Sequence, residues 1–214
     1  MMWGDFSMFH FIRVIIVALV FTISVLVILK AKKTDGIKYY IFLVIASIIL
    51  YTALLFIPFE NHFVSFTSPE DVYNYCKAPI KATHVIYGKN TAMVMSKNGE
   101  KNLFMIIPKV ENGWQLDSRI SAKSETYVIS EDITVNIKQY RNTNEFYIFV
   151  YDTSKKIGHI SDSENSSFTK LNEQEDTLCN TFCAYIEGVN KDYWIEVDGQ
   201  NICIFDNMCD SEMK

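Results

Sequence analysis

Two long apolar runs near the N-terminus, joined by a short lysine-rich link, constrain this chain more than any other feature. Tyr39–Phe59 is 21 residues long and carries no charged side chain, and Phe11–Leu29 is 19 residues long and carries one, Arg13. A helix of about 20 apolar residues crosses a membrane, where every backbone group must bond internally. Both runs are apolar on every face, unlike a core helix with one apolar stripe. We therefore predict a transmembrane hairpin over residues 1–60, with Arg13 snorkelling to the headgroups.

The link at residues 30–38 predicts how the hairpin is oriented. It contains four lysines and one acid, Asp35, and short loops rich in lysine stay in the cytoplasm. Arg13 is the only strong base before it, and the next base after the second run is Lys77. We expect both termini outside the cell and the rest of the chain to be extracytoplasmic. A cleavable signal peptide is the alternative for the first run, but Asp5 stands where a basic segment belongs and no small-residue cleavage site follows.

The remaining residues, 60–214, form a tail large enough to enclose its own core, because a domain of this size buries roughly 70% of its unfolded surface. The tail carries 15 of the 20 basic and 23 of the 25 acidic residues, which gives a net charge of −8. An acidic surface repels phosphate backbones and anionic lipid. We expect no nucleic-acid partner.

The tail begins with a helix signal and continues with strand signals. Ser68 is a typical N-cap, Pro69 fits the first helical position, and two acids follow, so a short helix is predicted from Pro69 to about Ala78. Runs of β-branched and aromatic residues then alternate with turn signals such as Asn98-Gly99, which predicts antiparallel strands. The predicted strands are 82–87, 91–96, 103–110, 114–116, 133–138, 145–151, 157–160, 181–188, 193–197 and 201–205.

We predict a membrane-anchored α+β chain in which the hairpin, with helices at 11–29 and 39–59, precedes a mainly antiparallel β domain with one short N-terminal helix. The expected lobes are 61–117, a helix plus a meander, and 118–214, a second β-rich lobe or part of the same domain. The polar segment 117–125 is the expected boundary between the two lobes. The polar stretch 161–176 is expected to be the most mobile part of the tail. Residues 206–214 are expected to fray.

Several short motifs after the hairpin carry a family resemblance. They are Ile57-Pro58-Phe59-Glu60-Asn61, Phe66-Thr67-Ser68-Pro69-Glu70-Asp71 followed by Tyr73 and Tyr75, Ile86-Tyr87-Gly88-Lys89, Ile107-Pro108-Lys109 and Gly113-Trp114. In this order, the chain resembles a group of small membrane-anchored proteins of Gram-positive, clostridial-type bacteria with an N-terminal two-helix hairpin and an extracytoplasmic domain. The resemblance covers the hairpin and the first half of the tail. It implies a location and an architecture, and it implies no mechanism.

Four of the five cysteines lie near the C-terminus, at Cys179, Cys183, Cys203 and Cys209. Outside the cytoplasm they are candidates for one or two disulfides, whose pairing sequence does not give. Plain buried thiols are the alternative. A zinc site is disfavoured, because the pairs are widely spaced and no histidine lies among them.

No catalytic, cofactor or metal site is predicted. The histidines His84 and His159 lie in or beside predicted strands, and neither has a nucleophile motif nearby. The acidic loop around Asp162 lacks the spacing of a calcium loop. Trp114 and Trp194 each follow a turn, so both are candidate interface residues, with a place in the β core as the alternative.

A domain of this size without a catalytic constellation favours a non-enzymatic interaction module of a bacterial envelope. Its expected partner is another envelope protein, a peptide or a wall component. A sensor, accessory or immunity-type subunit of a membrane complex is the second hypothesis, and an envelope enzyme of unknown reaction is the third.

Overall fold

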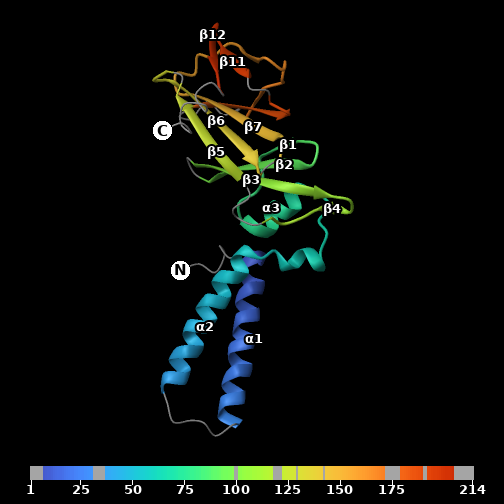
Figure 1. Cartoon of the computed structure of the whole chain (residues 1–214), viewed down its shortest axis with the longest axis vertical. Coiled ribbons are helices and arrows are strands. Elements are labelled where there is room, and N and C mark those ends of the chain that lie inside the picture. Colours follow the sequence, from blue (N-terminus) through green and yellow to red (C-terminus); the bar gives the residue numbers. More distant parts are fainter. Residues whose placement is uncertain are drawn as a thin grey trace. The chain divides into compact units, whose positions relative to one another are not determined.

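The structure is a computed structural model of the 214-residue chain, and it describes residues 7–30, 37–98, 101–117, 122–128, 130–141, 143–171, 179–189 and 192–204. Figure 1 shows the order of the elements along the chain. The chain divides into two compact units that interleave in sequence. The first unit comprises Met1–Ala82 and Val110–Arg119, and the second comprises Thr83–Lys109 and Ile120–Lys214.

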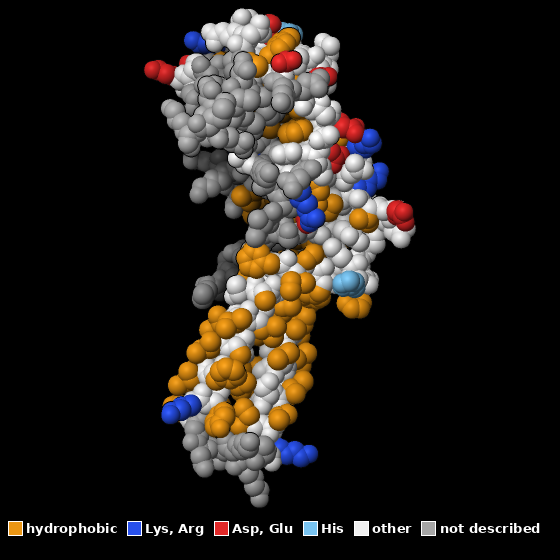
Figure 2. Space-filling model, viewed as in Figure 1, with side chains coloured by type: hydrophobic (Ala, Val, Ile, Leu, Met, Phe, Trp, Pro, Cys, Tyr) orange, Lys and Arg blue, Asp and Glu red, His pale blue; other side chains and the backbone are white. Residues whose placement is uncertain are grey.

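The first unit contains the two predicted long apolar helices, α1 (Met8–Lys30) and α2 (Ile37–Phe56), which form a hairpin (Figure 1). Phe9 and Arg13 are the buried residues of α1, and α2 has no buried residue. Large apolar side chains are exposed along both helices, with Leu26 at 59% and Phe42 at 68% (Figure 2). The hairpin therefore buries little of its apolar surface against the described parts of the protein.

A short 3-10 helix, η2 (Phe59–His62), and a third helix, α3 (Pro69–Lys77), follow the hairpin. The predicted cap of α3 is confirmed, because the Ser68 hydroxyl accepts a hydrogen bond from the backbone N–H of Asp71 at 3.1 Å. Glu70 and Asp71 lie in the first turn, where the helix dipole favours negative charge.

The two-residue strand β4 (Gly113–Trp114) returns to the segment between η2 and α3, within the first unit. The backbones of Trp114 and Phe66 exchange two hydrogen bonds, at 2.9 and 3.1 Å. Gly113 makes this approach possible, since a Cβ there would lie 2.4 Å from the Phe66 carbonyl oxygen. The Asn61 side chain adds two further bonds to the backbone of Leu116, at 2.8 and 3.0 Å.

The second unit is built from antiparallel strands in three sheets. In the first sheet, β1 (His84–Tyr87), β2 (Thr91–Asn98) and β3 (Lys101–Val110) lie in that order. The second has the order β5-β6-β7-β10-β9, formed by β5 (Ala122–Val128), β6 (Ile133–Tyr140), β7 (Glu145–Asp152), β10 (Asn180–Glu187) and β9 (Thr169–Lys170). The third has the order β12-β11-β8, formed by β12 (Gln200–Cys203), β11 (Trp194–Val197) and β8 (Ile160–Asp162).

Strand β7 is the centre of this unit, as its run of aromatic and β-branched residues predicts. Ile148 and Val150 pack with β11 residues such as Ile195, whereas Tyr147 and Phe149 pack with the first sheet. Because successive side chains point to opposite faces, β7 contributes to both clusters. The five-stranded sheet is therefore the middle layer, with the other two sheets on its faces.

One turn and one strand show where local chemistry specifies the fold and where it does not. Asp198 and Gly199 have φ values of 48° and 82° and join β11 to β12 as the predicted two-residue hairpin. Strand β5, in contrast, was not predicted, because it begins inside the polar segment that was expected to separate the two lobes. It pairs with β6 along its length, and Asn136 of β6 also bonds to Ser124 at 3.1 Å and to Thr126 at 2.7 Å.

Some sequence predictions fall on residues outside the described ranges. The described part of the polar stretch 161–176 includes the end of β8 and all of β9. Residues 172–178, the link residues 31–36 and the C-terminal residues 205–214, which include Cys209, lie outside the described ranges.

Candidate functional site

The candidate residues taken from the sequence lie in different parts of the fold. Trp114 is buried in the first unit, where its backbone pairs with Phe66. Trp194 is half-buried in β11 of the second unit and pairs in register with Cys203 of β12. An interface role for either tryptophan stays a prediction.

Of the described cysteines, Cys76 lies in α3, and the three near the C-terminus lie on two strands and one connection. Cys183 and Cys203 are free thiols, and Cys183 is buried in β10, where burial raises the pKa of its thiol well above the usual value. The Cys179 sulfur lies 3.9 Å from the Thr181 hydroxyl. The disulfide among Cys179, Cys183, Cys203 and Cys209 stays a prediction.

The most elaborate polar site in the first unit surrounds Arg13, where α1, the end of α2, η2 and α3 meet. Arg13 is fully buried, and its guanidinium forms a two-pronged ion pair with the carboxylate of Glu60 in η2. Glu60 is itself only 4% exposed. The predicted snorkelling of Arg13 to the headgroups is therefore wrong, because the side chain turns inward to a partner of opposite charge.

Every N–H group of the Arg13 guanidinium has an acceptor. Two bonds go to Glu60, and three go to backbone carbonyls, of Leu54 at 2.7 Å, Phe9 at 3.0 Å and Ile57 at 3.2 Å. The carbonyls at the end of α2 lack partners within the helix. A cation there is also attracted to the negative end of the helix dipole. Arg13 thus caps α2 from the neighbouring helix.

Aromatic rings enclose the pair and connect it to α3. The Arg13 guanidinium lies 3.4 Å from the centroid of the Phe9 ring and 4.9 Å from that of Phe59. The Tyr75 hydroxyl of α3 donates to Glu60 Oε1 at 3.0 Å, and its ring meets Phe9 edge to face. Burial, and then the hydrogen bond to the Glu60 carboxylate, raise the pKa of the Tyr75 hydroxyl. We call Arg13, Glu60, Tyr75, Phe9 and Phe59 the Arg13 cluster.

Sequence reasoning considered these residues one at a time and missed the cluster. Arg13 lies near the start of the first apolar run, and Glu60 directly follows the second. An antiparallel hairpin brings those two positions to the same end, and charges within membrane segments tend to pair with one another. The signal was therefore present in the spacing. Tyr75 had no comparable signal.

A second polar cluster, in the second unit, fixes the turn between β1 and β2. Glu145 is 3% exposed, and its Oε1 accepts from the Asn90 N–H at 2.7 Å and from the Tyr185 hydroxyl at 2.9 Å. The Lys89 N–H donates to the Tyr185 hydroxyl at 3.0 Å, and the Lys89 ammonium pairs with Glu187 at 2.7 Å. Burial is the main cause that raises the pKa of Tyr185 to about 12.

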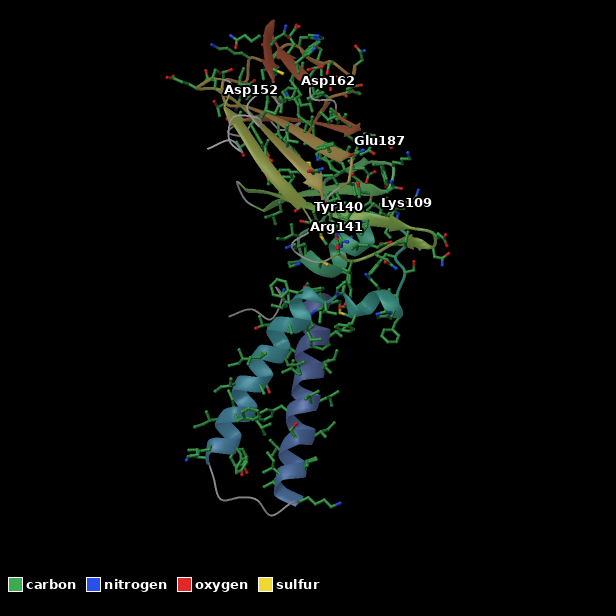
Figure 3. All side chains as sticks on the ribbon, viewed as in Figure 1. Lys109, Tyr140, Arg141, Asp152, Asp162 and Glu187 are labelled. Atoms are coloured by element: carbon green, nitrogen blue, oxygen red, sulfur yellow. The ribbon has the colours of Figure 1, made fainter. Side chains whose placement is uncertain are left out.

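Two other buried acids described in the second unit, Asp152 and Asp162, accept hydrogen bonds from loop residues. Asp152 accepts from the Ser154 hydroxyl and from two backbone N–H groups, and Asp162 accepts from the Tyr193 hydroxyl at 2.7 Å and the Ser166 N–H at 2.6 Å (Figure 3). His84 bonds to the neighbouring Thr83, and His159 is exposed. Among the described residues, no group of three His, Cys, Asp or Glu side chains could hold a metal ion.

In the Arg13 cluster the polar groups bond to each other and to the backbone, whereas in the second cluster Glu145 Oε1 is bonded and the buried Glu145 Oε2 has no hydrogen-bond partner among the described residues. No family model, curated protein or solved structure matches this chain. The resemblance to membrane-anchored clostridial-type proteins therefore stays a prediction.

Proposed function

We propose that this chain is a non-enzymatic, membrane-anchored interaction module of a bacterial envelope. Its hairpin spans the membrane twice, both termini lie outside, and the tail binds another envelope protein, a peptide or a wall component. The observation that carries the proposal is the exposure of two long apolar helices. Met8–Lys30 and Ile37–Phe56 are long enough to cross a hydrocarbon core and are almost uncovered by the described protein.

Charge supports the proposed orientation. Lys30 ends α1 and Lys38 lies in the first turn of α2, so the loop end of the hairpin is basic (Figure 2). Basic loops favour the cytoplasm, whereas aromatic residues occur at both membrane interfaces and do not distinguish them.

The Arg13 cluster supports anchoring of the first tail helix at the membrane. Through Glu60, the start of α1 is bonded to Tyr75 of α3, so α3 continues from the hairpin through packed side chains rather than through a loose linker. The same connection favours a second candidate function, a sensor or accessory subunit. In such a subunit, a conformational change in the hairpin would be transmitted to the tail through these side chains.

Membrane retention and photo-crosslinking test the proposal. The full chain should stay in the membrane fraction after an alkaline carbonate wash. A photo-reactive residue at Tyr87, which is 57% exposed on β1, should capture a reproducible envelope partner. The same residue at Phe42, 68% exposed on α2, is the matched position in the hairpin. Capture from Phe42 alone would favour the accessory subunit, and release by carbonate would refute the anchor.

A further inference from the structure

The turn that follows the hairpin exposes two neighbouring apolar side chains. Phe63 is 84% exposed and Val64 is 44% exposed, directly after η2. In sequence they follow the exposed end of the hairpin, where Phe56 is 44% and Ile57 is 54% exposed. Large apolar side chains that remain exposed together mark a surface that contacts a protein or a membrane.

Hydrogen bonds hold this turn in place on both sides. Before it, the Asn61 side chain forms two bonds with the backbone of Leu116, at 2.8 and 3.0 Å. After it, the backbones of Phe66 and Trp114 exchange two bonds, at 2.9 and 3.1 Å. The two apolar side chains therefore lie on a fixed turn between these bonds. A fixed turn loses little conformational freedom when it binds.

The same turn stays beside the end of the hairpin. The N–H group of Phe63 donates to the backbone carbonyl of Glu60 at 2.9 Å, and the Glu60 carboxylate is paired with Arg13. Arg13 in turn bonds to the Leu54 carbonyl in the last turn of α2, at 2.7 Å. This chain of contacts connects the backbone of Phe63 to the last turn of α2.

The length of α2 places that end at the edge of a hydrocarbon core. Ile37–Phe56 has 20 residues. At 1.5 Å per residue it rises about 30 Å, which matches the thickness of the core. The headgroup layer beyond the core is about 5–8 Å thick. A turn held beside the end of α2 therefore falls in or next to this layer.

The charge of the segment also suits a lipid surface. Residues 57–69 contain one acid, Glu60, which is 4% exposed and paired with Arg13, and they contain no lysine or arginine. The exposed His62 is the other titratable side chain of the segment. Anionic headgroups repel an acidic surface such as that of the whole tail, with its net charge of −8, but they do not repel this segment.

We propose that Phe63 and Val64 insert into the headgroup layer of the leaflet that faces the tail, as a lipid contact in addition to the two spanning helices. This inference rests on the proposed membrane anchor. Phenylalanine and aliphatic side chains bury at the boundary between headgroups and acyl chains when the backbone lies along the surface. The contact fixes the depth of η2, and Glu60 of η2 connects it to Tyr75 of α3.

Tryptophan fluorescence in vesicles tests the depth of Phe63. The full-length Phe63→Trp variant is reconstituted in dioleoylphosphatidylcholine and in the same lipid brominated near the ester end or near the methyl end of its chains. The wild-type chain, with three tryptophans, gives the background emission. The emission added by the variant should fall by about half with bromine near the ester end and less with bromine near the methyl end, because an interfacial ring reaches only the outer part of the chains.

Two matched variants calibrate the depth. Ile48→Trp, at a residue 60% exposed near the middle of α2, should be quenched most by bromine near the methyl end. Tyr87→Trp, at a residue 57% exposed in the second unit, should respond to neither lipid and should be quenched by iodide in the buffer. Equal responses of Phe63→Trp and Tyr87→Trp would overturn the proposal.

Failure of the anchor and a protein partner have different signatures. If neither Ile48→Trp nor Phe63→Trp is quenched by the brominated lipids, both the membrane anchor and the lipid contact are refuted. If Phe63→Trp alone is not quenched, only the contact is refuted. A photo-reactive residue at Phe63 should also form lipid adducts in isolated membranes, and protein adducts in their place would assign the turn to a protein partner and overturn the proposal.

Discussion

Arg13 of α1 and Glu60 of η2 form a buried ion pair although 47 positions separate them in the sequence. The pair joins the start of the first long helix to the residue that follows the second. It also satisfies carbonyls at the end of α2, and Glu60 receives the hydroxyl of Tyr75 from α3. One arginine therefore organises the junction between the hairpin and the first helix of the tail.

Glu60→Gln should destabilise this junction strongly. The substitution keeps the size of the side chain but leaves the Arg13 guanidinium buried without its counter-charge, which costs about 3–5 kcal/mol when a buried pair is broken. Thermal unfolding of the full chain in detergent, followed by circular dichroism, measures the effect. Glu187→Gln is the matched control, since Glu187 pairs with an exposed lysine and should change stability little. Equal effects of the two variants would show that the buried Arg13–Glu60 pair stabilises the protein no more than an exposed ion pair does.

Gly88→Ala should destabilise the second unit. A Cβ at Gly88 would lie 2.4 Å from the ring of Tyr185, and overpacking of this kind costs about 1–3 kcal/mol. Gly158→Ala is the control, because its Cβ would meet only Asp198 Oδ1 at an ordinary 3.7 Å. Urea unfolding of both variants compares the two sites. A Gly88→Ala variant as stable as Gly158→Ala would mean that the Tyr185 ring is not packed against this turn.

Alkaline pH should weaken the second unit through its buried tyrosines. Burial raises the pKa of Tyr185 from 10.0 to about 12, and it also raises the pKa values of Tyr147, Tyr151 and Tyr193. Above pH 10 the unfolded chain releases phenolic protons that the folded chain keeps. The free energy of unfolding should therefore be constant with respect to these groups below pH 10 and fall as pH rises toward and through 12.

Tyrosine variants identify the groups responsible for that fall. Tyr185→Phe should reduce the dependence of the free energy of unfolding on pH above 10. Urea midpoints measured across this pH range provide the comparison. Identical slopes in the wild type and in Tyr185→Phe would show that Tyr185 does not titrate with a raised pKa.

Cys183 should resist alkylation until the chain unfolds. It is 1% exposed, and burial raises the pKa of its thiol, so little of the reactive thiolate forms. Maleimide labelling with and without denaturant, read by peptide mass spectrometry, measures its protection relative to the half-buried Cys203. A non-reducing digest of the same sample tests the disulfide predicted among the four C-terminal cysteines. A Cys183-linked peptide in that digest would contradict the buried thiol.

Sequence patterns predicted the elements that are specified by residues close together in the chain. The hairpin helices follow from apolar length, α3 from its Ser68 cap, and the last hairpin from Asp198-Gly199. Strand β7 was recognisable as central because both of its faces are apolar. These features depend on residues close together in the chain.

The missed features depend on partners in other elements. Strand β5 lies in a polar segment without an apolar pattern, and it is paired with the neighbouring strand β6, whose Asn136 adds side-chain hydrogen bonds. The Arg13 cluster likewise needs Glu60 and Tyr75 from later elements. Composition and periodicity do not indicate that β5 pairs with β6 or that Tyr75 joins Glu60, whereas the Arg13–Glu60 pair could have been predicted, because a hairpin brings both positions to the same end.

The central proposal is that the hairpin spans the membrane with the link inside and the tail outside, and protease accessibility tests it most directly. Intact, wall-stripped Gram-positive cells are treated with an impermeant protease, with one epitope tag at the C-terminus and, in a separate strain, one between Lys33 and Thr34. The account predicts that the C-terminal tag is lost and that the tag in the link survives until the cells are lysed. Survival of the C-terminal tag in intact cells, with cleavage only after lysis, would place the tail in the cytosol and contradict the proposal.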